Sequence, residues 1–385
     1  MMKTLFTLGL VCCLFPLLAQ DAARVKHLDG QYISTEVLKE RLTYLVDSAK
    51  LAGLQVAIIN ENKLVWSGSF GFKDIENKKG LNDSTVMYAA SLTKPVTAYI
   101  FMRLVDRGVF SLDKPIHNYL KSAIGTYPKW RDLAEDTVLF NQITPRMLLS
   151  HSAGLPVLRQ IYGNSTKLIA KPGERFYYSN EGINLLGLLI EEFLGKPLEV
   201  IAREEVFEPL LMPRTSMIWE KSFEDNFSYA YFKDGKKYGS ERRRTSRAAG
   251  SMSTTAADYA RFYIALMTKK GLAKQSFRQM LEAQIPVASK RGFGSFKDSL
   301  THENDAIKLS WGLGLGLFQS PYGKAFFHTG HGDANQNYAV AFPERGMAVV
   351  LLSNSENFEK TSAQIIEACI GDRYSPLKWL GHLDQ

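Results

Sequence analysis

Ser91 and Lys94 stand three residues apart, where a segment with apolar residues at helical spacing begins. That spacing predicts a helix with the hydroxyl and the amine on one face, one turn apart. A serine near a helix N-terminus, beside an amine that carries protons, suits nucleophilic attack on a carbonyl carbon. Gly108 marks the expected end of this helix. The apolar positions are Val96, Ile100, Phe101, Leu104 and Val105.

The Ser-x-x-Lys pattern occurs three times in the chain, so the pattern alone is a weak signal. Pro115 directly follows the copy at 111–114, and Pro376 lies inside the copy at 375–378. Neither copy has the helical setting of the copy at 91–94. The competing interpretation of that copy is an ordinary helix-capping serine followed by a solvated lysine. Two further motifs along the chain favour the reactive pair.

Tyr178 and Asn180 offer a phenol and an amide two residues apart. The phenol can carry a proton, and the amide can hydrogen-bond a substrate. The alternatives are a packed aromatic residue for Tyr178, which follows Phe176 and Tyr177, and a helix cap for Asn180. Apolar spacing after Asn180 predicts that a helix begins there.

His328, Thr329 and Gly330 lie on an expected strand, where a donor or cationic side chain can meet a substrate. The ordinary alternative is a strand histidine satisfied by a neighbour. His331 and Asp333 follow, and together with His328 they invite a metal interpretation. We disfavour it because no partner cluster of histidines or acids has ligand spacing. We therefore expect neither a metal nor another cofactor.

Six stretches in this order resemble the serine β-lactamase and penicillin-binding-protein superfamily, on the branch of class C β-lactamases and D-alanyl-D-alanine carboxypeptidases. The resemblance covers nearly the whole mature chain and is far more specific than any single motif. The stretches are 88–94, 143–155, 172–180, 249–254, 311–314 and 328–330.

The resemblance implies a role for each candidate residue. Ser91 corresponds to the nucleophile, and Lys94 accepts or relays its proton or stabilises it electrostatically. Tyr178 corresponds to the proton shuttle toward the leaving group, and Asn180 to the ligand of the acyl side-chain amide. The backbone N–H groups of Ser91 and His331 correspond to the oxyanion hole. Either Lys94 or Tyr178 needs a lowered pKa to act as the base.

His328 departs from most β-lactamases of the family, which carry lysine there, whereas some carboxypeptidases carry histidine. Histidine is only partly protonated near pH 7, so it binds a substrate carboxylate more weakly than a lysine cation does. The leading hypothesis is an exported serine acyl hydrolase that acts on a D-amino-acid peptide, a related amide or an ester. The alternatives are a β-lactamase, and a penicillin-binding or envelope-binding protein with little or no turnover.

An apolar run from Leu5 to Leu18 follows Lys3 and predicts a secretory signal peptide over residues 1–20. The run is too short for a comfortable membrane span, so we expect a periplasmic or secreted protein without a stable membrane anchor. Removal of this segment leaves Cys369 as the only cysteine, which excludes an intrachain disulfide.

The formal net charge is +8, and the densest basic cluster lies at 242–244 with Arg247. A nucleic-acid interface needs interleaved aromatics or a recognition fold, and the sequence offers neither. We therefore expect a small-molecule or peptide substrate, such as a cell-wall peptide, a lactam or an ester.

Strand patterns at both ends of the chain surround a mostly helical middle. This order predicts an α/β fold (an α+β sandwich) with one antiparallel sheet built from both chain ends and flanked by helices. We expect a single domain over 21–385, with a sheet lobe at about 30–90 and 295–385 and an inserted helical lobe at about 95–290. The expected helices cover 37–49, 180–193, 255–266 and 364–370, with another beginning at 144–145. The expected strands cover 54–59, 64–70, 312–318, 324–328, 338–342 and 347–353.

Overall fold

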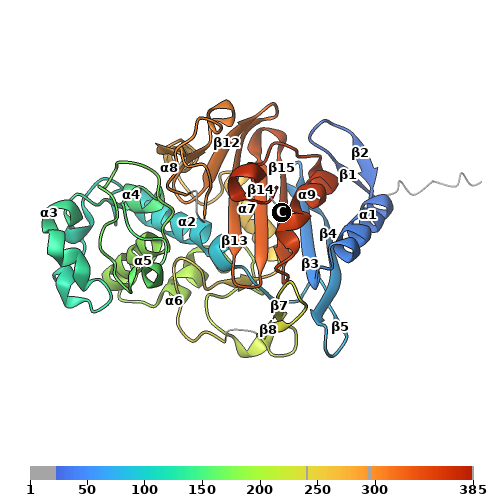
Figure 1. The fold of residues 1–385 in the computed structure, drawn as a ribbon, viewed down its shortest axis with the longest axis horizontal. Coiled ribbons are helices and arrows are strands. Elements are labelled where there is room, and N and C mark those ends of the chain that lie inside the picture. The colour runs from blue at the N-terminus through green and yellow to red at the C-terminus, as the bar shows by residue number, and fades with distance from the viewer. Residues whose placement is uncertain (1–22, 240–241, 294–296, 384–385) are drawn as a thin grey trace, which may run out of the picture.

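The computed structural model describes residues 23–239, 242–293 and 297–383. The expected signal peptide, residues 1–20, lies outside this range. Within it, a nine-stranded antiparallel sheet runs in the order β10-β11-β12-β13-β14-β15-β3-β4-β5 and forms the centre of the molecule (Figure 1). Its strands are β3 (Gly53–Asn60), β4 (Lys63–Asp74), β5 (Lys79–Gly80), β10 (Ile285–Pro286), β11 (Ser310–Trp311), β12 (Gly316–Ser320), β13 (Gly323–His331), β14 (Gln336–Phe342) and β15 (Met347–Ser353).

Helices cover both faces of this sheet. Helices α1 (Thr35–Ser48) and α9 (Ser362–Ile370) pack together on one face, and α7 (Ala256–Met267) packs on the other. Strand β15 is therefore buried on both sides. Val349 and Leu351 belong to the hydrophobic core on the side of α1 and α9, and Val350 belongs to the core on the side of α7. A strand buried on both faces reads as a continuous apolar run rather than an alternation. The antiparallel sheet built from both chain ends, and its helical flanks, are confirmed.

Between β4 and β10 the chain forms mostly helices and turns, and apart from α7 these lie beside the sheet (Figure 1). The helices are α2 (Thr93–Asp106), α3 (Thr137–Phe140), α4 (Pro145–Leu149), α5 (Asn180–Leu194), α6 (Leu198–Ala202) and α8 (Lys274–Met280), and α10 (Leu377–Leu380) follows near the C-terminus. The short strand pairs are β1 (Arg24–Lys26) with β2 (Tyr32–Ser34), β6 (Met87–Tyr88) with β9 (Ser253–Thr254), and β7 (Ala230–Tyr231) with β8 (Lys237–Gly239).

Most expected elements are present, and their start signals act as the sequence predicts. The Thr255 hydroxyl accepts a hydrogen bond from the Asp258 N–H at the start of α7. The Thr144 side chain does the same for Met147, with Pro145 at the first helical position of α4. None of the helices in the described ranges is long and apolar enough to cross a membrane.

The expected strand over 312–318 is confirmed only for residues 316–318, which belong to β12, and its first part is wrong because the chain turns between β11 and β12. The Gly312 N–H donates to the Leu315 carbonyl at 2.8 Å. A Cβ atom on Gly314, whose φ is +81°, would lie 2.3 Å from the Ala98 Cβ of α2. This turn needs glycine because it is pressed against the helix that follows the candidate nucleophile.

Candidate active site

Ser91 lies in a 3₁₀ turn, Ala90–Leu92, that leads directly into α2. The preceding residue, Ala90, adopts a left-handed φ of +48°, which is rare for a residue with a side chain and turns the chain sharply after β6. The N-terminus of α2 has no side-chain cap. The alternative in which Ser91 merely caps the helix is therefore wrong, and its hydroxyl faces a pocket instead.

Lys94 is fully buried, so the alternative of a solvated lysine is wrong. Its Nζ donates to the Ser91 Oγ at 2.8 Å and to the Ala249 carbonyl at 2.7 Å. No acidic side chain in the described ranges pairs with it. Burial lowers the pKa of Lys94 well below its usual value, because the ammonium form loses its hydration. The geometry thus joins a hydroxyl to an amine that favours its neutral form.

Tyr178 lies next to this pair, and its ring centroid is 4.9 Å from the Lys94 Nζ. Its hydroxyl is buried and makes no well-formed hydrogen bond with the described residues. Burial raises the pKa of Tyr178, and the nearby Ser91 side chain offsets this only slightly. The same burial therefore acts in opposite directions on the two groups, because it favours a neutral amine and a neutral phenol. A neutral amine can accept a proton from a hydroxyl, and a neutral phenol can donate one.

Asn180 occupies the first position of α5, but Ser179 supplies the cap by accepting a hydrogen bond from the Gly182 N–H at 2.8 Å. The interpretation of Asn180 as the cap is therefore wrong. Asn180 lines the pocket beside Ser91, and its Oδ1 is buried without a partner among the described residues. A buried amide oxygen that lacks a partner in the protein is well placed to accept a hydrogen bond from a ligand.

His328 is buried against Tyr178 and Trp311, with ring centroids 6.2 and 5.6 Å away. Its Nδ1 lies 2.7 Å from the Thr329 carbonyl, so Nδ1 carries the proton of the neutral ring. Burial and the nearby Lys94 lower the pKa of His328 to about 3. The expectation of a partly protonated ring near pH 7, which reads a carboxylate, is therefore wrong.

Gly330 brings β13 against the Ser91 turn. A Cβ atom at Gly330 would lie 2.3 Å from the Ala89 carbonyl oxygen, so only glycine allows this approach. The next residue, His331, lines the same pocket as Ser91. The structure thus brings together Ser91, Lys94, Tyr178, Asn180 and the 328–331 segment, which are far apart in the sequence.

The His331 side chain is 56% exposed, and its Nδ1 lies 2.8 Å from the Glu359 carboxylate. The His382 Nε2 lies 3.5 Å from the same carboxylate oxygen. The hydrogen bond and the charge of Glu359 raise the pKa of His331. Burial opposes ionisation of Glu359, but the two histidines prevail and lower its pKa to about 2. The pocket therefore has its readily protonated ring at His331 and not at His328. The Tyr238 hydroxyl donates a hydrogen bond to Asp333.

The pocket has a volume of about 310 Å³. The charged side chains among its described lining residues are Arg243, Arg247 and Asp333. Its other lining residues include Tyr88, Leu158, Asn184, Phe227, Tyr238 and Asn335. These residues come from widely separated parts of the chain, which is why spacing alone did not identify them.

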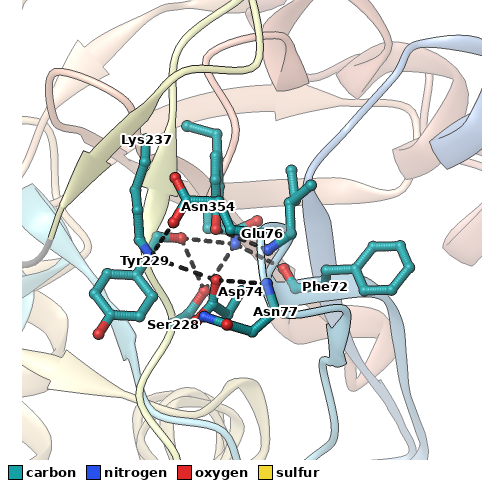
Figure 2. Close-up of polar contacts among 10 residues, drawn as sticks. Phe72, Asp74, Glu76, Asn77, Ser228, Tyr229, Lys237 and Asn354 are labelled. Carbon is teal, nitrogen blue, oxygen red and sulfur yellow. Dashed lines mark hydrogen bonds and ion pairs between the residues drawn. The ribbon is translucent and has the colours of Figure 1, made fainter.

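A polar cluster anchors one wall of the pocket (Figure 2). The Asn354 Nδ2 donates to the Ser228 Oγ and the Tyr229 carbonyl, both at 2.8 Å, and to the Phe72 carbonyl at 3.0 Å. The Lys237 ammonium lies 3.4 Å from the buried Asp74 carboxylate. Figure 2 shows Lys237 and Asp74 joined as an ion pair within this cluster. The β7–β8 hairpin, which carries Tyr238 and Gly239 into the pocket wall, is therefore fastened to the central sheet.

The chain is similar to known proteins over most of its length. The model of the Beta-lactamase family matches residues 38–368. A beta-lactamase of Yersinia enterocolitica is 24% identical over 248 residues, which is 61% of this chain and 60% of that protein. The chain thus spans less than two thirds of that curated relative.

Solved structures share the fold. A penicillin-binding protein homologue from Pyrococcus abyssi, described as octameric, superposes with a TM-score of 0.72 at 22% identity, over 89% of this chain and 80% of that chain. The D-alanine carboxypeptidase AmpC from Burkholderia cenocepacia has a TM-score of 0.68 at 18% identity, over 86% and 98% of the two chains.

Proposed function

Because the chain belongs to the Beta-lactamase family, we propose that it is a serine acyl hydrolase that forms an acyl ester on Ser91. Family membership supports a serine acyl hydrolase in general, and the proposed substrates are a D-amino-acid peptide, a related amide or an ester. The observation that carries the proposal is the 2.8 Å contact between the Ser91 hydroxyl and a buried amine, Lys94. Export to the periplasm or beyond is part of the proposal and rests on the sequence of residues 1–20.

The proposed reaction moves one proton from the nucleophile to the leaving group. Neutral Lys94 takes the Ser91 proton as Oγ attacks the carbonyl carbon. The N–H groups of Ser91 and His331 hold the oxyanion, and one such donor is typically worth about 3 kcal/mol. Tyr178 gives its proton to the leaving group and regains one from the Lys94 ammonium. Water then hydrolyses the ester and frees Ser91.

The pocket supports a substrate with an acidic end. Asn180 offers a free amide oxygen to an N–H group of the acyl part. Among the described residues that line the pocket, Arg243, Arg247 and His331 can carry positive charge, and Asp333 carries a carboxylate. His331 thus takes the carboxylate-reading role that the sequence suggested for His328.

A substrate panel tests the proposed function. We expect the purified protein to turn over a D-alanyl-D-alanine peptide or a short nitrophenyl ester faster than a chromogenic cephalosporin, because neutral His328 stands where most β-lactamases carry lysine. Initial rates measured on all three substrates distinguish a peptidase or esterase from a β-lactamase. A preference for the cephalosporin would favour a β-lactamase. A stable penicillin adduct without turnover would favour the penicillin-binding alternative.

A second prediction concerns the pH dependence of binding. The pKa of His331 is raised, so its imidazolium form persists to a higher pH than that of an ordinary histidine. We therefore expect the affinity for a carboxylate substrate to fall as the pH rises through this raised pKa. Glu359→Gln should move that fall to lower pH and raise KM for the carboxylate substrate about fivefold in the intervening window. The methyl ester of the same substrate should show neither effect. KM against pH for both substrates measures this.

The chain offers a matched control for this pair. His302 and Asp305 form an exposed histidine–carboxylate contact of 3.0 Å away from the pocket. Asp305→Asn should leave both profiles unchanged. If Glu359→Gln leaves the carboxylate and methyl ester profiles parallel, His331 does not read the carboxylate.

A further inference from the structure

His151 holds the chain on both sides of Tyr178. Its backbone carbonyl accepts a hydrogen bond from the Tyr177 N–H at 2.7 Å. Its ring Nδ1 accepts a second from the Ser179 N–H at 3.1 Å. His151, which follows α4, thus holds the two peptide groups that flank the Tyr178 side chain. Its ring contact with Ser179 spans 28 positions of the sequence.

The His151 ring also packs on the Tyr178 ring itself. The two ring centroids are 4.4 Å apart, and Trp311 and Phe176 enclose the histidine at 5.4 and 6.0 Å. Burial, with smaller contributions from Lys94 and His328, lowers the pKa of His151 well below its usual value. The ring is therefore neutral, and because Nδ1 accepts from a backbone N–H, its proton lies on Nε2.

Two features of His151 have a cost in stability. Its φ of +55° is left-handed, which is uncommon for a residue with a bulky side chain. Its Nε2 is buried and makes no hydrogen bond within the described residues, like the Tyr178 hydroxyl. Strain and unmet hydrogen bonds concentrate where a function requires them. Glycine or asparagine would suit the backbone better, so the ring is retained at a cost.

We propose that His151 is a positioning residue that sets the place of the Tyr178 hydroxyl relative to Ser91. It acts through the hydrogen bonds that its carbonyl and its ring accept from the Tyr177 and Ser179 N–H groups, and through its ring contact with Tyr178. It touches no reacting atom. The inference rests on the proposed function, in which Tyr178 carries the proton to the leaving group. A misplacement of about 1 Å in a reacting group can lower a rate about 100-fold, so a positioning residue has a measurable effect on turnover.

Two substitutions remove the imidazole of His151 in different ways. His151→Phe keeps an aromatic ring but removes the acceptor for the Ser179 N–H. His151→Gly removes the ring but suits the left-handed backbone, so it preserves folding if phenylalanine does not. We expect each to lower kcat about tenfold to hundredfold with KM nearly unchanged. His151→Asn should restore most of the activity, because its Oδ1 can replace Nδ1 and asparagine tolerates this φ.

A double-mutant cycle separates positioning from general packing. In a Tyr178→Phe background, His151→Phe should change kcat less than twofold, because the group that it positions is already absent. Phe176→Leu is the control, since it thins the same aromatic cluster without touching either hydrogen bond to 177–179. It should lower the melting temperature but leave kcat within about threefold of wild type.

The outcomes separate this inference from the proposed function. If Tyr178→Phe retains its turnover, the proton-shuttle role itself is wrong. If Tyr178→Phe loses turnover but the folded His151→Phe or His151→Gly protein keeps its kcat, the role of His151 alone is overturned. Equal losses from His151→Phe in the wild-type and Tyr178→Phe backgrounds overturn it as well, because His151 then acts independently of Tyr178.

Discussion

Ser91→Ala is expected to lower turnover on the order of 10⁴–10⁶-fold, as removal of a catalytic serine does in other serine hydrolases. The expectation follows from the uncapped helix start, which leaves the hydroxyl free, and from its contact with Lys94. Intact-mass spectrometry after incubation with a penicillin or a fluorophosphonate should show an adduct that maps to Ser91. The variant should form no adduct while its melting temperature stays close to that of wild type.

The chain supplies a matched control for this experiment. Ser111 belongs to another Ser-x-x-Lys copy, and its side chain accepts a hydrogen bond from the Asp113 N–H in an exposed loop. Ser111→Ala should keep full activity and full labelling. Labelling that persists unchanged in Ser91→Ala would rule out Ser91 as the nucleophile.

Lys94→Gln is expected to lower kcat/KM about 10²–10⁴-fold, the usual contribution of a general base. The glutamine amide can still donate to the Ala249 carbonyl, but it cannot accept the Ser91 proton at neutral pH. In wild type, burial lowers the pKa of Lys94. Activity should therefore be low at pH values below this pKa, where the amine is protonated, and should rise with pH as the amine loses its proton. This limb of the pH–rate profile should be absent from the residual activity of the variant.

Lys114→Gln is the corresponding control, because Lys114 occupies the equivalent place in another Ser-x-x-Lys copy. It should retain the wild-type profile. If the Lys94→Gln variant keeps more than a third of the wild-type kcat/KM, a group other than Lys94 acts as the base. The raised pKa of Tyr178 already makes that residue a poor candidate.

Local signals in the sequence were enough to locate most of the elements and to single out Ser91 and Lys94 as the proposed reactive pair. Helix caps at Thr144 and Thr255, and the apolar run of β15, act over a few residues and can be read directly. The turn at 312–315 was missed because glycines alternating with apolar residues resemble a strand. Its actual cause is the close approach of α2, which the local sequence does not contain.

The chemical state of the site depends on contacts between distant residues. Lys94 binds the Ala249 carbonyl across 155 positions, and the partner of His331 lies 28 positions further along the chain. The neutrality of His328 follows from burial among aromatic rings that assemble only in the fold. Residue type identified these groups, but only the folded arrangement determines which ring is charged.

The pairing of β3 with β15 constrains the order in which the chain can fold as it is made. The Ser353 hydroxyl donates to the Gly53 carbonyl across 300 positions. At a synthesis rate of about 5–20 residues per second, β3 therefore waits about 15–60 s for its neighbour. During that time one edge of an apolar strand has no partner and is open to intermolecular pairing. The central sheet is thus completed only when nearly the whole chain is available.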